Sequence, residues 1–222
     1  MDWYVYIIFI LIIIILFWLY IGMQIAMSIV VPKIRDLKAT MIEEETRDES
    51  LMDYYFKHKT DEYQIQSKKG YAIQIYEMIK DPNIRNFVVI SHGYTYSHHG
   101  SIKYAKLMMS LGFNAILYDH RFHGLSGGKN TTLGYHEHQD LKQVIDTVYQ
   151  KYGEDIYLGT YGESMGSATC LLEQANDSRV QFVISDAGFK SLRPLIEREI
   201  SRKKLPVKWF YGIANIFVWL IS

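Results

Sequence analysis

The sequence is poor in cysteine and carries no excess charge of either sign. Cys170 is the single cysteine among 222 residues, which excludes an internal disulfide. The 24 lysines and arginines balance 24 aspartates and glutamates, so the formal net charge is zero. The sequence also lacks internal repeats and any basic patch interleaved with aromatic residues. The zero net charge and the missing basic patch argue against nucleic acid as a partner. The length allows one domain plus a shorter segment.

Charged residues are also missing between Asp2 and Lys33, where the run Trp3–Val31 is almost entirely apolar. A run of this length exceeds the roughly 20 apolar residues that cross a bilayer, so it predicts a transmembrane helix. A cleavable signal peptide is the alternative, but no basic segment precedes the run and the run is too long for one. We therefore expect an uncleaved, single-pass anchor over residues 1–32.

Aromatic and basic residues flank this apolar run. The aromatic residues at its start are Trp3, Tyr4 and Tyr6, and the basic residues beyond its end are Lys33, Arg35 and Lys38. The aromatic residues suit a membrane interface, and the positive-inside rule places the chain after the run on the cytoplasmic side. Residues 33–60 are expected to form a charged linker, helical where it approaches the core.

The clearest motif is Gly162-Glu163-Ser164-Met165-Gly166, which has the pattern G-x-S-x-G. Residues 155–161 before it resemble a buried strand, and residues 167–175 after it have the spacing of a helix. A nucleophile elbow occurs in this strand–turn–helix context, where glycines permit a strained, closely packed turn. The pattern predicts that Ser164 is a catalytic nucleophile. The alternative is a glycine-flanked turn with an exposed serine.

Further strands alternate with helices around this motif. Strands are expected at residues 63–66, 71–79, 86–91, 113–118 and 181–185, and helices at residues 101–110 and 135–152. This alternation is typical of βαβ units and predicts the α/β class, with a mostly parallel sheet and flanking helices. The core is expected over residues 61–190, followed by the start of a helical cap over residues 191–222.

Three sequence blocks occur in a characteristic order. They are His92-Gly93-Tyr94, the loop Asp119-x-Arg121-x-His123-Gly124-x-Ser126, and the elbow Gly162–Gly166. With these blocks the chain resembles the α/β-hydrolase superfamily over about residues 54–190, and it is similar to small membrane-anchored hydrolases of Gram-positive bacteria. The resemblance implies the α/β-hydrolase fold, a Ser164 nucleophile, and Tyr94 and Met165 as donors of an oxyanion hole.

The resemblance also implies the chemistry. Such an enzyme cleaves an ester, thioester or amide of a small or lipid-like acyl group through an acyl-enzyme, without a metal or an organic cofactor. The pairs His120/His123 and His136/His138 are an alternative metal site. They lack the arrangement of a tetrahedral zinc set, so roles in loops and caps are favoured.

All eight histidines precede Ser164, whereas the α/β-hydrolase order places the acid and then the histidine after the nucleophile. Asp186 is a candidate acid, with a loop-capping role as the alternative. An upstream histidine such as His92, His120 or His123 is the remaining source of a base. From the resemblance we expect a C-terminally truncated chain that is nearly inactive as it stands. The alternative is a non-catalytic, degenerate hydrolase that only binds at the membrane.

Overall fold

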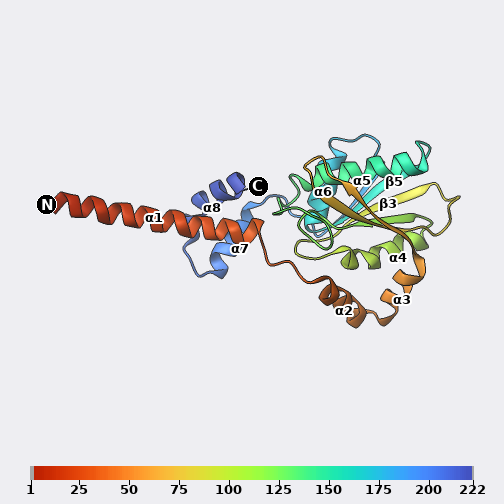
Figure 1. Cartoon of the computed structure of the whole chain (residues 1–222), viewed down its shortest axis with the longest axis horizontal. Coiled ribbons are helices and arrows are strands. Elements are labelled where there is room, and N and C mark those ends of the chain that lie inside the picture. The colour runs from red at the N-terminus through yellow and green to blue at the C-terminus, as the bar shows by residue number, and fades with distance from the viewer. Residues whose placement is uncertain (1–2, 222) are drawn as a thin grey trace. The chain divides into compact units, whose positions relative to one another are not determined.

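The computed structural model describes residues 3–221, which divide into two compact units. One unit contains residues 33–190, and the other is built from residues 3–32 and 191–221 (Figure 1). The second unit therefore joins segments from opposite ends of the described chain.

The larger unit is built on a six-stranded mixed sheet in the order β1-β2-β4-β3-β5-β6. The strands are β1 (Lys59–Gln66), β2 (Ala72–Met78), β3 (Asn86–Ser91), β4 (Asn114–Tyr118), β5 (Tyr157–Glu163) and β6 (Phe182–Asp186). β2 pairs antiparallel with β1 and β4, whereas β4-β3, β3-β5 and β5-β6 are parallel pairs. This topology confirms the α/β-hydrolase class, with a mostly parallel sheet and flanking helices.

Helices cover both faces of this sheet. They are α2 (Leu37–Arg47), α3 (Glu49–His58), the 3₁₀ helix η1 (His98–Ser101), α4 (Ile102–Ser110), α5 (Glu137–Tyr152) and α6 (Met165–Gln174). Phe87 and Val89 of β3 point to a core shared with α5 and α6, whereas Val88 and Ile90 point to a core shared with α3 and α4. Successive side chains of a strand alternate between faces, so a strand covered on both sides is apolar throughout, as the sequence of β3 indicated.

Residues 33–60 are an integrated part of this unit. Asp36 caps α2, because its carboxylate accepts hydrogen bonds from the backbone N–H groups of Lys38 and Ala39. Helix α3 buries an apolar face, formed by Leu51, Met52 and Tyr55, in the core beneath α4. The segment expected to be a charged linker therefore also supplies core residues.

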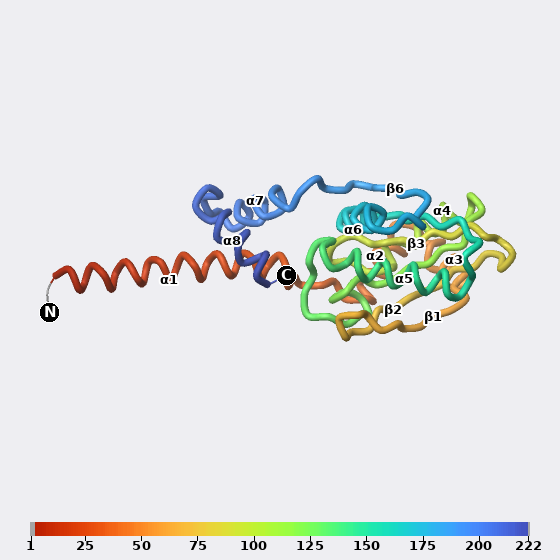
Figure 2. The backbone as a smooth tube through the Cα atoms, turned by 90° about the horizontal axis from the view of Figure 1, so that it is seen from above, coloured from red at the N-terminus to blue at the C-terminus, as the bar shows by residue number. Residues whose placement is uncertain are grey.

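The smaller unit consists of three helices, α1 (Trp3–Val30), α7 (Arg193–Arg202) and α8 (Val207–Ile221). Helix α1 is long and apolar enough to cross a membrane, which fits the predicted anchor. Only its second half has a buried face, consisting of Gly22, Ile25, Ala26, Ile29 and Val30. Figure 2 shows α7 and α8 lying along this half of α1.

Candidate active site

Ser164 lies at the sharp turn between β5 and α6. Its φ of +54° and ψ of −109° are unusual for a residue with a side chain, and its backbone N–H donates to the carbonyl of Asp186 at 2.8 Å. A Cβ on Gly162 would overlap the carbonyl of Gly166, and a Cβ on Gly166 would overlap the carbonyl of Ser91. The turn therefore has the geometry that the motif predicts for a nucleophile elbow, while the catalytic role of Ser164 stays a prediction.

Replacing Gly166 by alanine is expected to destabilise residues 33–190 by about 3 kcal/mol, because the new methyl group meets rigid backbone atoms of β3. Thermal unfolding followed by circular dichroism measures the loss. Gly93→Ala is the matched control, because its Cβ would lie in ordinary contact, 3.7 Å from the Glu163 carbonyl and 3.8 Å from the Ser164 Cβ. Equal stability of the two variants would contradict the packing argument.

Ser164 lines a pocket of about 270 Å³. Gly93 and Tyr94, from the loop after β3, line the same pocket. Met165 is the first residue of α6, so its N–H has no acceptor within the helix. The structure thus places Tyr94 at the same pocket as Ser164, and Met165 directly follows Ser164, while the oxyanion roles of Tyr94 and Met165 stay predictions.

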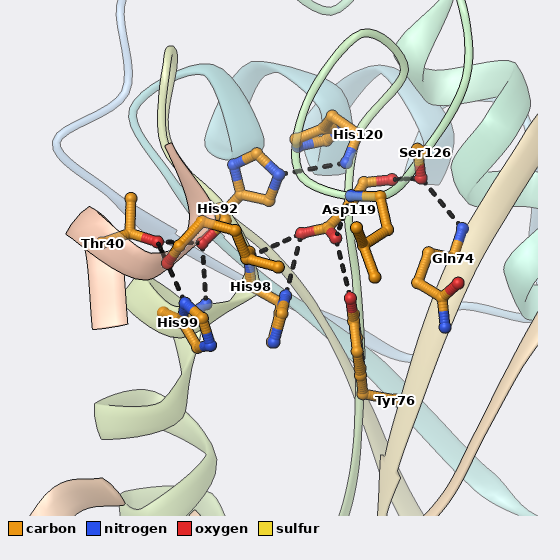
Figure 3. Close-up of polar contacts among 12 residues, drawn as sticks. Thr40, Gln74, Tyr76, His92, His98, His99, Asp119, His120 and Ser126 are labelled. Carbon is orange, nitrogen blue, oxygen red and sulfur yellow. Dashed lines mark hydrogen bonds and ion pairs between the residues drawn. The ribbon is translucent and has the colours of Figure 1, made fainter. Parts of the chain in front are cut away.

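Two buried histidines hold the loop that carries Tyr94. His92 Nδ1–H donates to the Gly93 carbonyl at 2.8 Å, and His92 Nε2 accepts from the backbone N–H of His120 at 3.0 Å (Figure 3). His123 Nδ1–H donates to the Arg121 carbonyl at 2.8 Å, and its Nε2 accepts from the N–H of Thr95 at 3.0 Å. Because each ring donates through one nitrogen and accepts through the other, both are neutral and have no nitrogen left to take a proton from serine.

Burial also favours the neutral form of the buried histidine rings. It lowers the pKa of His92 well below its ordinary value, helped by the neighbouring His120 and His123, and it lowers the pKa of His120 to about 3. Both ring nitrogens of His120 are buried without a hydrogen-bond partner in the described chain. Within residues 3–221 no hydrogen bond joins Ser164 to a histidine, and no group of three potential ligands is placed to hold a metal ion.

Asp119, at the end of β4, organises the neighbouring loop (Figure 3). Its carboxylate accepts hydrogen bonds from Tyr76 at 3.0 Å, from the backbone and ring of His98 at 2.8 and 3.0 Å, and from the Leu125 N–H at 3.0 Å. Burial alone would raise the pKa of this carboxyl, but the nearby imidazole of His98 and these donors hold it well below its usual range. Asp119 is thus a structural anchor for the loop carrying His123.

Asp186, the candidate acid, is the last residue of β6, and its backbone carbonyl accepts the hydrogen bond from the Ser164 N–H. Its carboxylate accepts hydrogen bonds from the hydroxyls of Tyr104 at 2.9 Å and Tyr161 at 3.4 Å. No histidine is bonded to it within residues 3–221. Its role as a catalytic acid therefore stays a prediction.

The polar wall of the pocket was not predicted from the sequence. This wall includes Arg35, Glu44 and Arg47 from the segment before β1, Tyr96 from the loop after β3, Lys103 from α4 and Glu163 from the end of β5. Buried Glu44 accepts hydrogen bonds from Arg47 at 2.5 Å and from the Tyr96 hydroxyl at 2.7 Å. The sequence signal, a glutamate three residues before an arginine, predicts only a charged helix surface, because the contact with Tyr96 is remote in sequence.

The fold and the elbow together define an α/β hydrolase, and comparison with known proteins agrees. The sequence matches the family described as serine aminopeptidase, S33, over residues 82–215, which is more than half of the chain. The chain therefore belongs to this family. It is also similar to the uncharacterized protein YqkD of Bacillus subtilis (strain 168), with 36% identity over 160 residues. That alignment covers 70% of this chain and 52% of YqkD, so the chain spans about half the length of this relative.

Solved structures show the same fold. The esterase Pf2001 of Pyrococcus furiosus aligns with a TM-score of 0.61 and 23% identity, over 75% of this chain and 65% of the esterase. The α/β hydrolase GrgF of Penicillium sp. sh18 aligns with a TM-score of 0.55 and 18% identity, over 65% of this chain and 51% of GrgF. At these identities the likeness concerns the fold.

Proposed function

We propose that this protein is a serine hydrolase that cleaves a carboxylic ester, thioester or amide through an acyl-enzyme on Ser164. The observation that carries the proposal is the strained position of Ser164 at the β5–α6 turn, in a pocket shared with Gly93 and Tyr94. A residue whose strained backbone is held at a pocket by the surrounding structure is typical of functional sites.

In the proposed reaction, the oxygen of Ser164 attacks the carbonyl carbon of the substrate. The negative charge that develops on the carbonyl oxygen is stabilised by the N–H groups of Tyr94 and Met165. The proton of the serine hydroxyl passes to a base and then to the leaving group as the bond to that group breaks. Water then hydrolyses the acyl-serine and regenerates the hydroxyl.

The charged residues of the pocket wall indicate which substrates the pocket could accept. Lys103 Nζ lies 3.6 Å from the carboxylate of Glu163, the residue directly before the nucleophile, and Glu44 and Arg47 form an ion pair on the opposite segment. We propose that the part of the substrate next to Ser164 is small and polar, and that a lipid-like acyl chain, if present, lies elsewhere. Hydrolysis of p-nitrophenyl acetate in preference to octanoate would support this.

A second candidate is a non-catalytic protein that binds a ligand at the membrane. It is favoured by the absence of a hydrogen bond between Ser164 and any histidine within residues 3–221, and by the complete engagement of His92 and His123. Without a base, a serine hydroxyl keeps its ordinary low reactivity, and an oxyanion hole alone supports only slight turnover. We therefore expect the 222-residue chain to be nearly inactive by itself.

A fluorophosphonate probe distinguishes the two candidates. We expect slow labelling of Ser164, identified by mass spectrometry of its peptide, and faster labelling when free imidazole supplies the base. Ser167→Ala is the control, because Ser167 lies in the first turn of α6 with its hydroxyl 2.6 Å from that of Ser185. Labelling that is absent even with imidazole would favour the binding protein.

We also propose that α1 anchors the protein in a membrane with residues 33–190 on the cytoplasmic side. The length and apolar composition of α1 and the basic residues Lys33, Arg35 and Lys38 support this. The protein is expected to stay in the membrane pellet after alkaline carbonate washing, and its larger unit is expected to be digested by protease only in inverted vesicles. Release by carbonate would refute the anchor, and digestion in right-side-out vesicles would reverse the orientation.

A further inference from the structure

Helix α1 has two halves with different surroundings. From Trp3 to Tyr20 its side chains are largely exposed, whereas from Gly22 to Val30 it buries one face. The exposed half rises about 27 Å at 1.5 Å per residue, which is close to the thickness of the hydrocarbon core of a bilayer. The exposed half alone is thus long enough to span the apolar layer.

The buried face of α1 is occupied by protein. At Gly22 a Cβ would lie 2.7 Å from Ile213 of α8, so the two helices pack closely at this point. Further along, the Ser28 hydroxyl donates to the carboxylate of Glu199 on α7 at 2.9 Å. A carboxylate bonded at this level suits an aqueous or headgroup environment better than hydrocarbon, so the second half of α1 belongs outside the apolar layer.

The boundary between the halves is marked by two tryptophans. The indole N–H of Trp18 donates to the backbone carbonyl of Trp209 at 3.0 Å, and both side chains are exposed. Tryptophan is enriched where the hydrocarbon of a membrane meets its headgroups. Directly before Trp209, the turn between α7 and α8 lies near the middle of α1 (Figure 2).

Together with the adjoining ends of α7 and α8, this turn spans residues 202–208, which we call the α7–α8 turn, and it is strongly basic. Residues 202–208 carry four exposed cations and no acid, namely Arg202, Lys203, Lys204 and Lys208. Arg202 and Lys203 pair with Glu199, whereas Lys204 and Lys208 form no ion pair within residues 3–221. The turn therefore keeps positive charge at the level where α1 would leave the hydrocarbon.

We propose that the α7–α8 turn, residues 202–208, is a docking surface for anionic lipid headgroups around the anchor. The inference rests on the proposed membrane anchor and deepens it by naming the lipid. Charge complementarity favours phosphate groups, and the turn is continuous with the exposed apolar half of α1 through the Trp18–Trp209 contact. The same four cations add to the positive charge of Lys33, and so favour the cytoplasmic orientation.

Hydrogen exchange of the full chain in vesicles tests the proposal. Vesicles are made of phosphatidylcholine alone or mixed with phosphatidylglycerol, and exchange is followed in peptides covering residues 200–209. We expect exchange about tenfold slower in the anionic vesicles, with the difference lost at high salt. Equal exchange in both vesicles would overturn the proposal.

Two variants of equal charge change make the result specific. Replacement of Arg202, Lys203, Lys204 and Lys208 by glutamine should abolish the lipid dependence. Replacement of Lys57, Lys68, Lys69 and Lys129, all exposed on the larger unit, by glutamine should preserve it. An equal loss in both variants would show a general charge effect and overturn the specific surface.

Carbonate washing of the same vesicles distinguishes failure of the membrane anchor from failure of the lipid-binding turn. A protein that is released from phosphatidylcholine vesicles lacks the anchor, and both proposals fail. A protein that is retained but shows no dependence on phosphatidylglycerol keeps the anchor and loses the lipid-binding turn.

Discussion

Ser164→Ala is expected to reduce ester hydrolysis by the protein at least about a hundredfold when imidazole is supplied as a base. The reason is that alanine removes the atom that forms the acyl-enzyme while leaving the strained turn and its glycines in place. Release of p-nitrophenol from p-nitrophenyl acetate, corrected for hydrolysis by imidazole alone, measures the effect.

Comparing the wild type with Ser164→Ala, with and without imidazole, shows whether the base is added imidazole or a histidine of the chain. If the wild-type protein turns over rapidly without imidazole and Ser164→Ala does not, an upstream histidine is acting, and His120→Gln identifies whether it is the ring with two unpaired nitrogens. If Ser164→Ala keeps most of the wild-type rate under both conditions, Ser164 is not the nucleophile.

The elbow was predictable because its physical constraints are local. Gly162, Ser164 and Gly166 lie within one turn, and the flanking apolar runs define a strand and a helix without knowledge of distant residues. The sheet was predictable for a similar reason, since strands buried on both faces are short apolar runs that alternate with amphipathic helices.

The surroundings of the site were not predictable because they depend on contacts between remote residues. Thr40 of α2 shares hydrogen bonds with the Ser97 hydroxyl at 2.8 Å and with Nδ1 of His99 at 3.0 Å (Figure 3). The charge pattern of residues 33–60 indicates a solvated surface, and only the folded chain shows that one edge of it closes the pocket. The roles of His92 and His123 as fixed neutral rings likewise follow from backbone atoms elsewhere in the chain.

Acid is expected to destabilise residues 33–190 already between pH 6.5 and pH 5, above the range in which most carboxyl groups titrate. Burial lowers the pKa of His99 and of His120 to about 3 in each case, with nearby histidines adding to the effect. In the unfolded chain both groups take a proton below about pH 6.5. Their contribution to stability is therefore complete above pH 6.5 and declines as the pH falls toward the folded pKa, by about 2 kcal/mol for each group at pH 5.

Urea unfolding at several pH values between 8 and 5 measures this loss, and two substitutions isolate its cause. His120→Leu removes a ring whose nitrogens are buried without partners, so the variant should be at least as stable as the wild type at pH 7.5. Its stability should also fall less steeply with acid, by about 1.4 kcal/mol per pH unit.

His123→Leu is the contrasting variant, because it removes the acceptor of the Thr95 N–H group and leaves that partly buried donor unpaired. It should be destabilised by about 1–3 kcal/mol even at pH 7.5. The difference between the variants follows from the hydrogen bonds alone, since both replace a buried imidazole by the same apolar side chain. If His120→Leu retained the wild-type pH dependence, the buried neutral ring would not be the source of the acid sensitivity.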